Sequence, residues 1–257
     1  MKKKVLIRGP ILTQSGYGEH ARCVWRALKS REDLFEVFIE PITWGLTSWL
    51  WEDDKERHQI DLDIQKASLH AHSGGSFDVA LLVTIPNEWE RVAPITIGVT
   101  AGIESSKISP NWIQTTNEKV DSVIVVSEFS KQIFENTTYF HEDPVTNKKT
   151  SLRVDKPIKV VNYPVKESKD VKLDLQLQAD FNFLLMAQWG PRKNVENTIR
   201  WFVEEFIDQE VGLVLKINKK NNSIMDKEYV KLAVKRLLAE YPNRKCKINL
   251  LHGFMNH

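Results

Sequence analysis

The chain has 257 residues, of which 42% are hydrophobic, so it is long enough to bury one or two separate cores. Its 36 basic and 34 acidic residues leave a net charge of +2, and this balance excludes the strongly basic character of most nucleic-acid-binding proteins. No apolar run reaches the roughly 18 residues of a membrane-spanning helix, and the run from Val5 to Ile7 is too short for a signal peptide. We therefore expect a cytoplasmic protein whose two cysteines, Cys23 and Cys246, stay reduced, while peripheral contact with a membrane stays open.

From the N-terminus onward, apolar strand-like runs alternate with helical patterns, which predicts an α/β fold with mainly parallel strands. The run Val5 to Ile7 is the first predicted strand, and Gly18 to Lys29 has apolar residues at helical spacing. Ser127 is predicted to cap a helix, and the polar, aperiodic residues 141–156 predict an exposed loop. The other elements predicted in this part are strands at 35–40, 78–83, 95–100, 122–126 and 157–162, and some helix around 54–68.

A charged segment at residues 166–172 predicts a domain boundary. We expect residues 1–168 to form an N-terminal Rossmann-like domain and residues 169–257 to form the first half of a second one. The second part has fewer residues than the roughly 100–150 of a typical domain and stops just after a predicted strand. Its predicted elements are strands at 181–187, 211–217 and 247–251 and helices at 194–208 and 226–241.

The first segment that suggests chemistry is "RGPILTQSGYGEHAR", residues 8–22, where a loop of small residues joins a strand to a helix. Glycine lets backbone amides approach a phosphate, and a helix N-terminus favours negative charge. The stretch Gly16-Tyr17-Gly18, with Ala21, also fits the dinucleotide pattern G-x-G-x-x-A. About eight residues separate it from the predicted strand, whereas the first glycine of a dinucleotide fold follows its strand immediately. A plain glycine-rich turn is the alternative.

The second such segment is "MAQWGPRKNVENTI", residues 186–199, which places Arg192 and Lys193 at a predicted helix start. The helix macrodipole disfavours cations there, so a bound anion would explain them. A lysine is a good partner for a diphosphate oxygen, and an arginine adds a planar pair of donors. The alternative is a solvated first turn with no ligand.

Taken together, the two segments resemble the retaining, nucleotide-sugar-dependent glycosyltransferases of family four, which have the GT-B fold of two facing Rossmann-like domains. In that family a pattern like G-R-L-x-P-x-K-N follows the first strand of the second domain, and its Arg and Lys hold the donor diphosphate. The matching stretch here is residues 187–194, "AQWGPRKN". Lys193 keeps the family's lysine, but Gln188 stands where the family usually has arginine. We hypothesise that Arg192 compensates for the missing charge.

Three further segments are similar to parts of the same family. Residues 121–137 look like its strand–Ser–helix step, residues 158–165 like its closing strand before the linker, and residues 248–257 like its strand running into G-F/V-x-x. The family's second domain continues with a Glu-x7-Glu segment that contacts the donor sugar and nucleoside, and this segment has no counterpart here. The resemblance therefore implies a GT-B-like chain truncated within its C-terminal domain, which is a fragment, a short reading frame or a chain that needs a partner.

The resemblance implies a hexosyltransferase-type enzyme that moves a sugar from a UDP- or GDP-sugar to a saccharide or other hydroxyl acceptor. It also implies retention of configuration, with no metal and no cofactor besides the nucleotide-sugar substrate. Two tryptophans, Trp44 and Trp49, are candidate stacking surfaces for a sugar, and Glu104 follows a predicted strand at the end where α/β clefts bind ligands. The residues predicted to bind the donor diphosphate are Gly16, Tyr17, Gly18, Gln188, Arg192 and Lys193.

Three other hypotheses stay open at this point. A non-catalytic, truncated sugar-nucleotide-binding module would bind the donor without turnover. A sugar-nucleotide epimerase of GT-B shape would form product without an acceptor. An NAD-binding dehydrogenase would bind NAD(H) and no sugar nucleotide.

Overall fold

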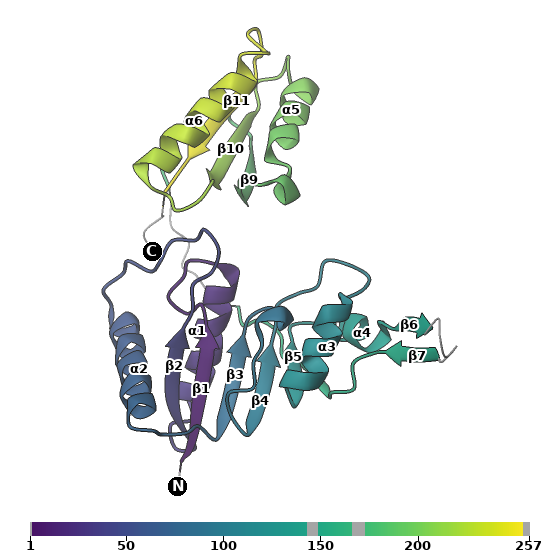
Figure 1. Cartoon of the computed structure of the whole chain (residues 1–257). Coiled ribbons are helices and arrows are strands. Elements are labelled where there is room, and N and C mark those ends of the chain that lie inside the picture. The colour runs from purple at the N-terminus through teal and green to yellow at the C-terminus, as the bar shows by residue number, and fades with distance from the viewer. Residues whose placement is uncertain (1, 143–148, 166–172, 254–257) are drawn as a thin grey trace. The chain divides into compact units, whose positions relative to one another are not determined.

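The computed structural model describes residues 2–142, 149–165 and 173–253 (Figure 1). These residues form two compact units, the first built mainly from residues 2–165 and the second mainly from residues 173–253. Each unit has its own apolar core. The boundary predicted near residue 168 lies outside the described residues.

The first unit is built on a six-stranded sheet in the order β2-β1-β3-β4-β5-β8, with every neighbouring pair parallel (Figure 1). The chain leaves β1 for the edge strand β2 and then returns to β3 on the other side of β1. This reversal is the topological switch point at which doubly wound sheets bind ligands, beside the carboxyl ends of the strands. The strands are β1 (Lys3–Gly9), β2 (Phe35–Pro41), β3 (Val79–Val83), β4 (Ile95–Val99), β5 (Ser122–Val125) and β8 (Ile158–Val160).

Four helices of the first unit begin at side-chain caps, as the positions of Ser and Asp in the sequence favour. Ser15, Asp54, Ser109 and Ser127 each accept the backbone amide three residues further on. The prediction that Ser127 caps a helix is therefore confirmed. The helices are α1 (Gly16–Lys29), α2 (Lys55–His72), α3 (Pro110–Lys119) and α4 (Glu128–Asn136), and a short 3-10 helix, η1, spans Pro86–Glu88.

The prediction of a loop over residues 141–156 was wrong at residues 141–142 and 149–152. Strands β6 (Tyr139–Glu142) and β7 (Lys149–Leu152) pair antiparallel there (Figure 1). Tertiary contacts stabilise the pair, because the Tyr139 hydroxyl donates to the Ile108 carbonyl at 2.8 Å and Leu152 packs against the core. Helix α3 was not predicted either, although Ser109 and Pro110 form a favourable start for it.

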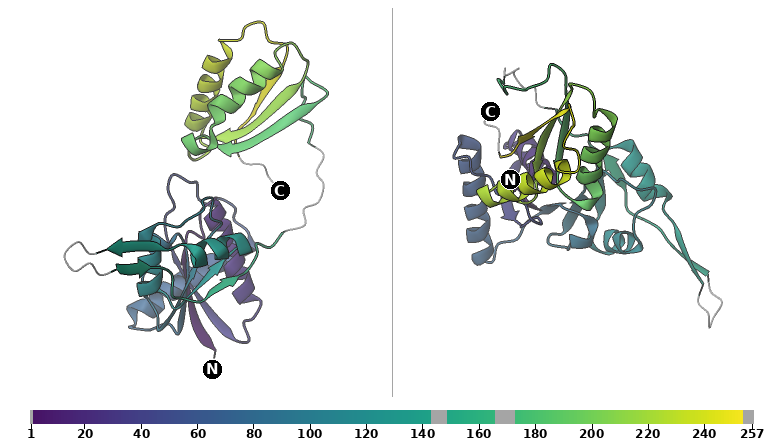
Figure 2. Two further views of the ribbon diagram at one scale, coloured as in Figure 1. Left: turned by 90° about the vertical axis from the view of Figure 1, so that its right-hand side faces the viewer. Right: turned by 90° about the horizontal axis from the view of Figure 1, so that it is seen from above.

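The second unit has a three-stranded parallel sheet in the order β11-β10-β9, and its two helices cover one face of that sheet (Figure 2). Both crossovers step in the same direction across the sheet, so right-handed connections place both helices on the same side. The other face exposes Leu184 and Met186. The elements are β9 (Asn182–Gln188), the 3-10 helix η2 (Pro191–Lys193), α5 (Val195–Glu205), β10 (Gly212–Asn218), α6 (Ile224–Leu238) and β11 (Lys247–Leu251).

The observed elements of the second unit begin close to the predicted ones, and the main difference lies around residue 194. Helix α5 begins at Val195, and Asn194 before it has a left-handed backbone with φ of 49°. Arg192 and Lys193 therefore belong to the preceding turn η2 and not to the first turn of α5. None of the helices in the described part of the chain has the length and hydropathy needed to cross a bilayer.

Candidate functional site

The residues predicted to bind a diphosphate divide between the two units. Gly16, Tyr17 and Gly18 form the start of α1 in the first unit, and Gln188, Arg192 and Lys193 lie at the end of β9 and in η2 in the second. Both groups follow the carboxyl end of a parallel strand, which is where α/β proteins bind anionic ligands.

In the first unit, the glycine-rich loop is closed by the cap of α1. The Gly18 amide donates to Ser15 Oγ at 2.9 Å, so this amide is already paired. The Gly16 and Tyr17 amides come before the first internal hydrogen bond of the helix and are the donors that it offers to a ligand. Gly18 is glycine for steric reasons, because a Cβ there would lie 2.0 Å from the Thr13 carbonyl oxygen. A Cβ on Gly16 would meet no atom within 4 Å.

The same loop is fixed by Arg22, whose side chain is buried one turn into α1. Its Nη1 donates to the carbonyls of Ile11 at 2.6 Å and Thr13 at 2.9 Å, and its Nε donates to Glu19 at 2.9 Å. Two loop carbonyls thus depend on one guanidinium. The burial of Arg22 was not predicted, because an arginine on a helix is usually a solvated residue.

Tyr17 joins the loop to the end of β4. Its hydroxyl lies 2.9 Å from Thr100 Oγ1 and accepts the Ala101 amide at 3.1 Å, and its ring centroid lies 4.6 Å from that of Trp44. Burial raises the pKa of Tyr17, so the phenol stays protonated at neutral pH. These contacts show Tyr17 joining the loop before α1 to the segments that follow β2 and β4.

The predicted acceptor residues lie at the same edge of the sheet as this loop. Trp44 packs on Tyr17 and is half-buried, while Trp49 is half-exposed and forms a β-bridge with Thr13. Glu104 is exposed in the segment that follows β4. The structure thus brings both tryptophans to the glycine-rich loop, and Glu104 lies on the neighbouring loop.

One buried ionisable side chain near this loop, His20, was not anticipated. Its Nδ1 has no hydrogen-bond partner among the residues that the structure describes, and its ring lies edge-on to Tyr163, with centroids 4.9 Å apart. Burial lowers the pKa of His20 to about 4, so the imidazole is neutral at pH 7. Its place on α1 is visible in the sequence, but its burial depends on Tyr163, which comes from a distant segment.

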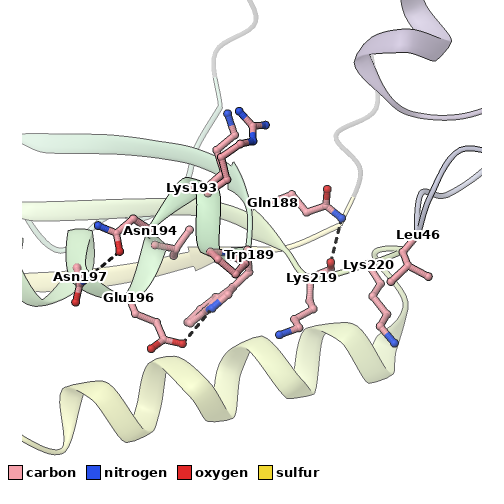
Figure 3. Close-up of a pocket in the computed structure, with 13 residues that line it drawn as sticks. Leu46, Gln188, Trp189, Lys193, Asn194, Glu196, Asn197, Lys219 and Lys220 are labelled. Carbon is pink, nitrogen blue, oxygen red and sulfur yellow. Dashed lines mark hydrogen bonds between the residues drawn. The ribbon is translucent and has the colours of Figure 1, made fainter. Parts of the chain in front are cut away.

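In the second unit, a hollow is lined by residues 188–197 and by Lys219 and Lys220 (Figure 3). Gln188 Nε2 donates to the Lys219 carbonyl at 3.1 Å and so ties the end of β9 to the loop after β10. Trp189 is buried, and its Nε1 donates to Glu196 at 3.3 Å. These bonds fix the turn that carries Arg192 and Lys193.

The hollow is lined by four cations, Arg192, Lys193, Lys219 and Lys220, and their side chains do not all converge on one point. Figure 3 shows Lys193 pointing away from the side on which Lys219 and Lys220 lie. Lys219 Nζ bonds the hydroxyl of Tyr229 on α6 at 3.1 Å. The cations of the hollow therefore fall into two groups, Arg192 and Lys193 on the turn η2 and Lys219 and Lys220 after β10.

A buried carboxylate holds the loop after β10. Both oxygens of Asp226 accept backbone amides, those of Lys219 and Lys220, each at 3.0 Å. His252, which follows β11, places its Nε2 3.0 Å from Asp226 Oδ2. The pairing of Asp226 with His252 was not predicted, since 26 residues separate the two in the sequence.

Compared with known proteins, the chain matches no protein-family model and no curated protein. What the structure establishes is an α/β protein with a six-stranded parallel sheet in the first unit and a three-stranded parallel sheet in the second.

Proposed function

We propose that this chain binds the diphosphate of a nucleotide sugar and serves glycosyl transfer to an acceptor hydroxyl. The observation that carries the proposal is the turn η2, where Arg192 and Lys193 follow the end of β9 and line a hollow. A lysine and an arginine side by side can neutralise two phosphate charges. Glu196 is an acid that lines the same hollow, and its carboxylate accepts a hydrogen bond from the indole N–H of Trp189.

In the proposed reaction, the bond from the anomeric carbon of the sugar to the diphosphate breaks, the acceptor oxygen bonds to that carbon on the same face, and negative charge develops on the leaving phosphate. Lys193 and Arg192 stabilise that charge, which is the electrostatic form of catalysis. The leaving phosphate takes the proton of the acceptor hydroxyl, so the reaction needs no pair of catalytic carboxylates. The free amides of Gly16 and Tyr17 offer a further anion-binding element in the first unit.

The variant Lys193→Ala tests the diphosphate role. We expect it to weaken binding of a UDP- or GDP-sugar by at least about 1.5 kcal/mol, the size of a hydrogen bond to a charged group, as measured by titration calorimetry. Lys245→Ala is the matched control, because this exposed lysine precedes β11 and lies at the amino end of the strands. Equal affinity of Lys193→Ala and wild type would exclude the role.

Turnover assays separate the remaining hypotheses. Product that forms only with an acceptor supports glycosyl transfer, and product without an acceptor supports an epimerase. Donor binding without any turnover supports a sugar-nucleotide-binding module. Binding of NAD(H) but of no nucleotide sugar supports a dehydrogenase.

A further inference from the structure

The outer surface of α6 carries an apolar stripe that no other described element covers. Met225, Tyr229 and Leu232 are 78%, 50% and 52% exposed. Their spacing of four and then three residues places them in one row along the helix. The buried row of α6, which includes Val230 and Val234, lies on the opposite side of the helix. The stripe is thus separate from the core of the second unit.

Helix α5 adds an aromatic side chain to the same outer surface. Trp201 is 60% exposed and lies opposite the buried row of α5, which includes Ile199 and Phe202. Because α5 and α6 cover the same face of the sheet (Figure 2), their outward sides belong to one surface. We call the surface formed by Trp201, Ile224, Met225, Tyr229 and Leu232 the helix-layer surface.

The α6 side of the helix-layer surface is also basic, while the exposed acids Glu204 and Glu205 lie one turn after Trp201 on α5. Between residues 219 and 236 the only exposed acid is Glu228, because Asp226 is buried against His252. Six cations lie in the same range, namely Lys219, Lys220, Lys227, Lys231, Lys235 and Arg236. This excess contrasts with the near-neutral chain as a whole, so positive charge is concentrated beside the apolar stripe.

The lysines and the apolar side chains are arranged together. Lys219 Nζ lies 4.7 Å from the centroid of the Tyr229 ring and 3.1 Å from its hydroxyl, so the charge sits directly beside the stripe. Long basic side chains that lie along apolar surface and end in a charge are typical of helices at a membrane interface. Tyr and Trp, with an apolar body and a polar tip, favour the same location.

We propose that the helix-layer surface docks this protein onto an anionic lipid bilayer, with α6 lying along the interface. A bilayer fits the surface better than a protein groove does, because the apolar side chains protrude singly from the outside of a helix layer and alternate with cations. The apolar stripe enters the headgroup region, and the lysines attract the anionic lipids. The proposal is independent of the proposed glycosyl transfer.

Vesicle flotation with the full chain tests the proposal. We expect the protein to float with vesicles of phosphatidylcholine and phosphatidylglycerol at low salt, to release at 0.5 M salt, and to bind phosphatidylcholine vesicles at least tenfold more weakly. The triple variant Met225→Ser/Tyr229→Ser/Leu232→Ser should bind the anionic vesicles at least tenfold more weakly. Since these side chains are exposed, its circular dichroism spectrum should match that of wild type.

The open face of the sheet in the second unit provides the matched control. Leu184 and Met186 are 63% and 68% exposed there, on the side away from α6. The variant Leu184→Ser/Met186→Ser should keep full vesicle binding, whereas Lys231→Gln/Lys235→Gln should weaken it. Absence of binding to anionic vesicles overturns the proposal, as does an equal loss in the control variant. Salt-sensitive binding to an acidic protein without vesicle binding would assign the surface to a protein partner instead.

Discussion

Two glycines in the first loop have different physical roles, although they are two residues apart. Gly18→Ala would force a Cβ against the Thr13 carbonyl oxygen, at 2.0 Å, and the loop would have to move. We expect it to lower the free energy of unfolding by about 2 kcal/mol or more, measured by urea denaturation. Gly16→Ala has open space and a helical position, so a change within about 0.5 kcal/mol is expected. Equal effects of the two substitutions would contradict this steric explanation.

At the scale of single residues, the buried His20 makes the free energy of unfolding depend on pH. Its pKa is about 4 in the folded protein and about 6.5 when unfolded, so between these values only the unfolded state takes up the proton. The contribution of His20 is therefore complete above pH 6.5 and is lost as the pH falls towards 4. Between pH 7.5 and pH 5 we expect His20 to lower the free energy of unfolding by about 2 kcal/mol.

The variant His20→Gln isolates this contribution from that of the other ionisable groups. Urea unfolding of wild type and variant at the two pH values gives the difference directly. The variant should lose about 2 kcal/mol less than wild type on acidification. The same loss in both proteins would mean that His20 can be charged in the folded state.

At the scale of elements, the connection from β1 to α1 depends on one buried arginine. In the variant Arg22→Met, the carbonyls of Ile11 and Thr13 and the carboxylate of Glu19 lose a donor. We expect a cost of about 2–4 kcal/mol in urea denaturation, because buried acceptors are left without partners.

The control for this prediction is Arg31→Met, since Arg31 is exposed and pairs with Asp33 on the surface. Exposed ion pairs contribute little to stability, so this variant should unfold at nearly the same urea concentration as wild type. If the Arg22 and Arg31 variants were equally stable, the loop would not depend on the buried guanidinium.

At the scale of the whole molecule, the two units should differ in independent stability. The first unit has two clusters of buried apolar residues, which pack around its six-stranded sheet. We expect residues 1–165, expressed alone, to unfold in one cooperative transition monitored by circular dichroism. Residues 173–257 alone should bind the dye ANS, because one face of their parallel sheet is open and apolar. A non-cooperative first unit would show that it depends on the second.

Local patterns in the sequence predicted most of the described elements. The strands from β1 to β5 and the strands of the second unit were found from short apolar runs, because a buried parallel strand is apolar on both faces. The pair β6–β7 was missed, since distant contacts such as that of Tyr139 with Ile108 stabilise it. Helix α3 was missed although Ser109 and Pro110 give a local signal for its start. The backbone of Asn194, which ends η2 before α5 begins, also gave no signal in the residue pattern.

The sequence by itself determined the alternation of strands and helices and the places of the glycine-rich loop and of the turn with Arg192 and Lys193, because local propensity and spacing encode these features. Only the tertiary structure decided why Gly18 is glycine, which carbonyls Arg22 holds and why His20 is neutral. Each of these depends on atoms brought together from separate segments, and burial and steric contact of that kind do not follow from local spacing. The direction of Lys219, towards Tyr229 and away from Lys193, was decided in the same way.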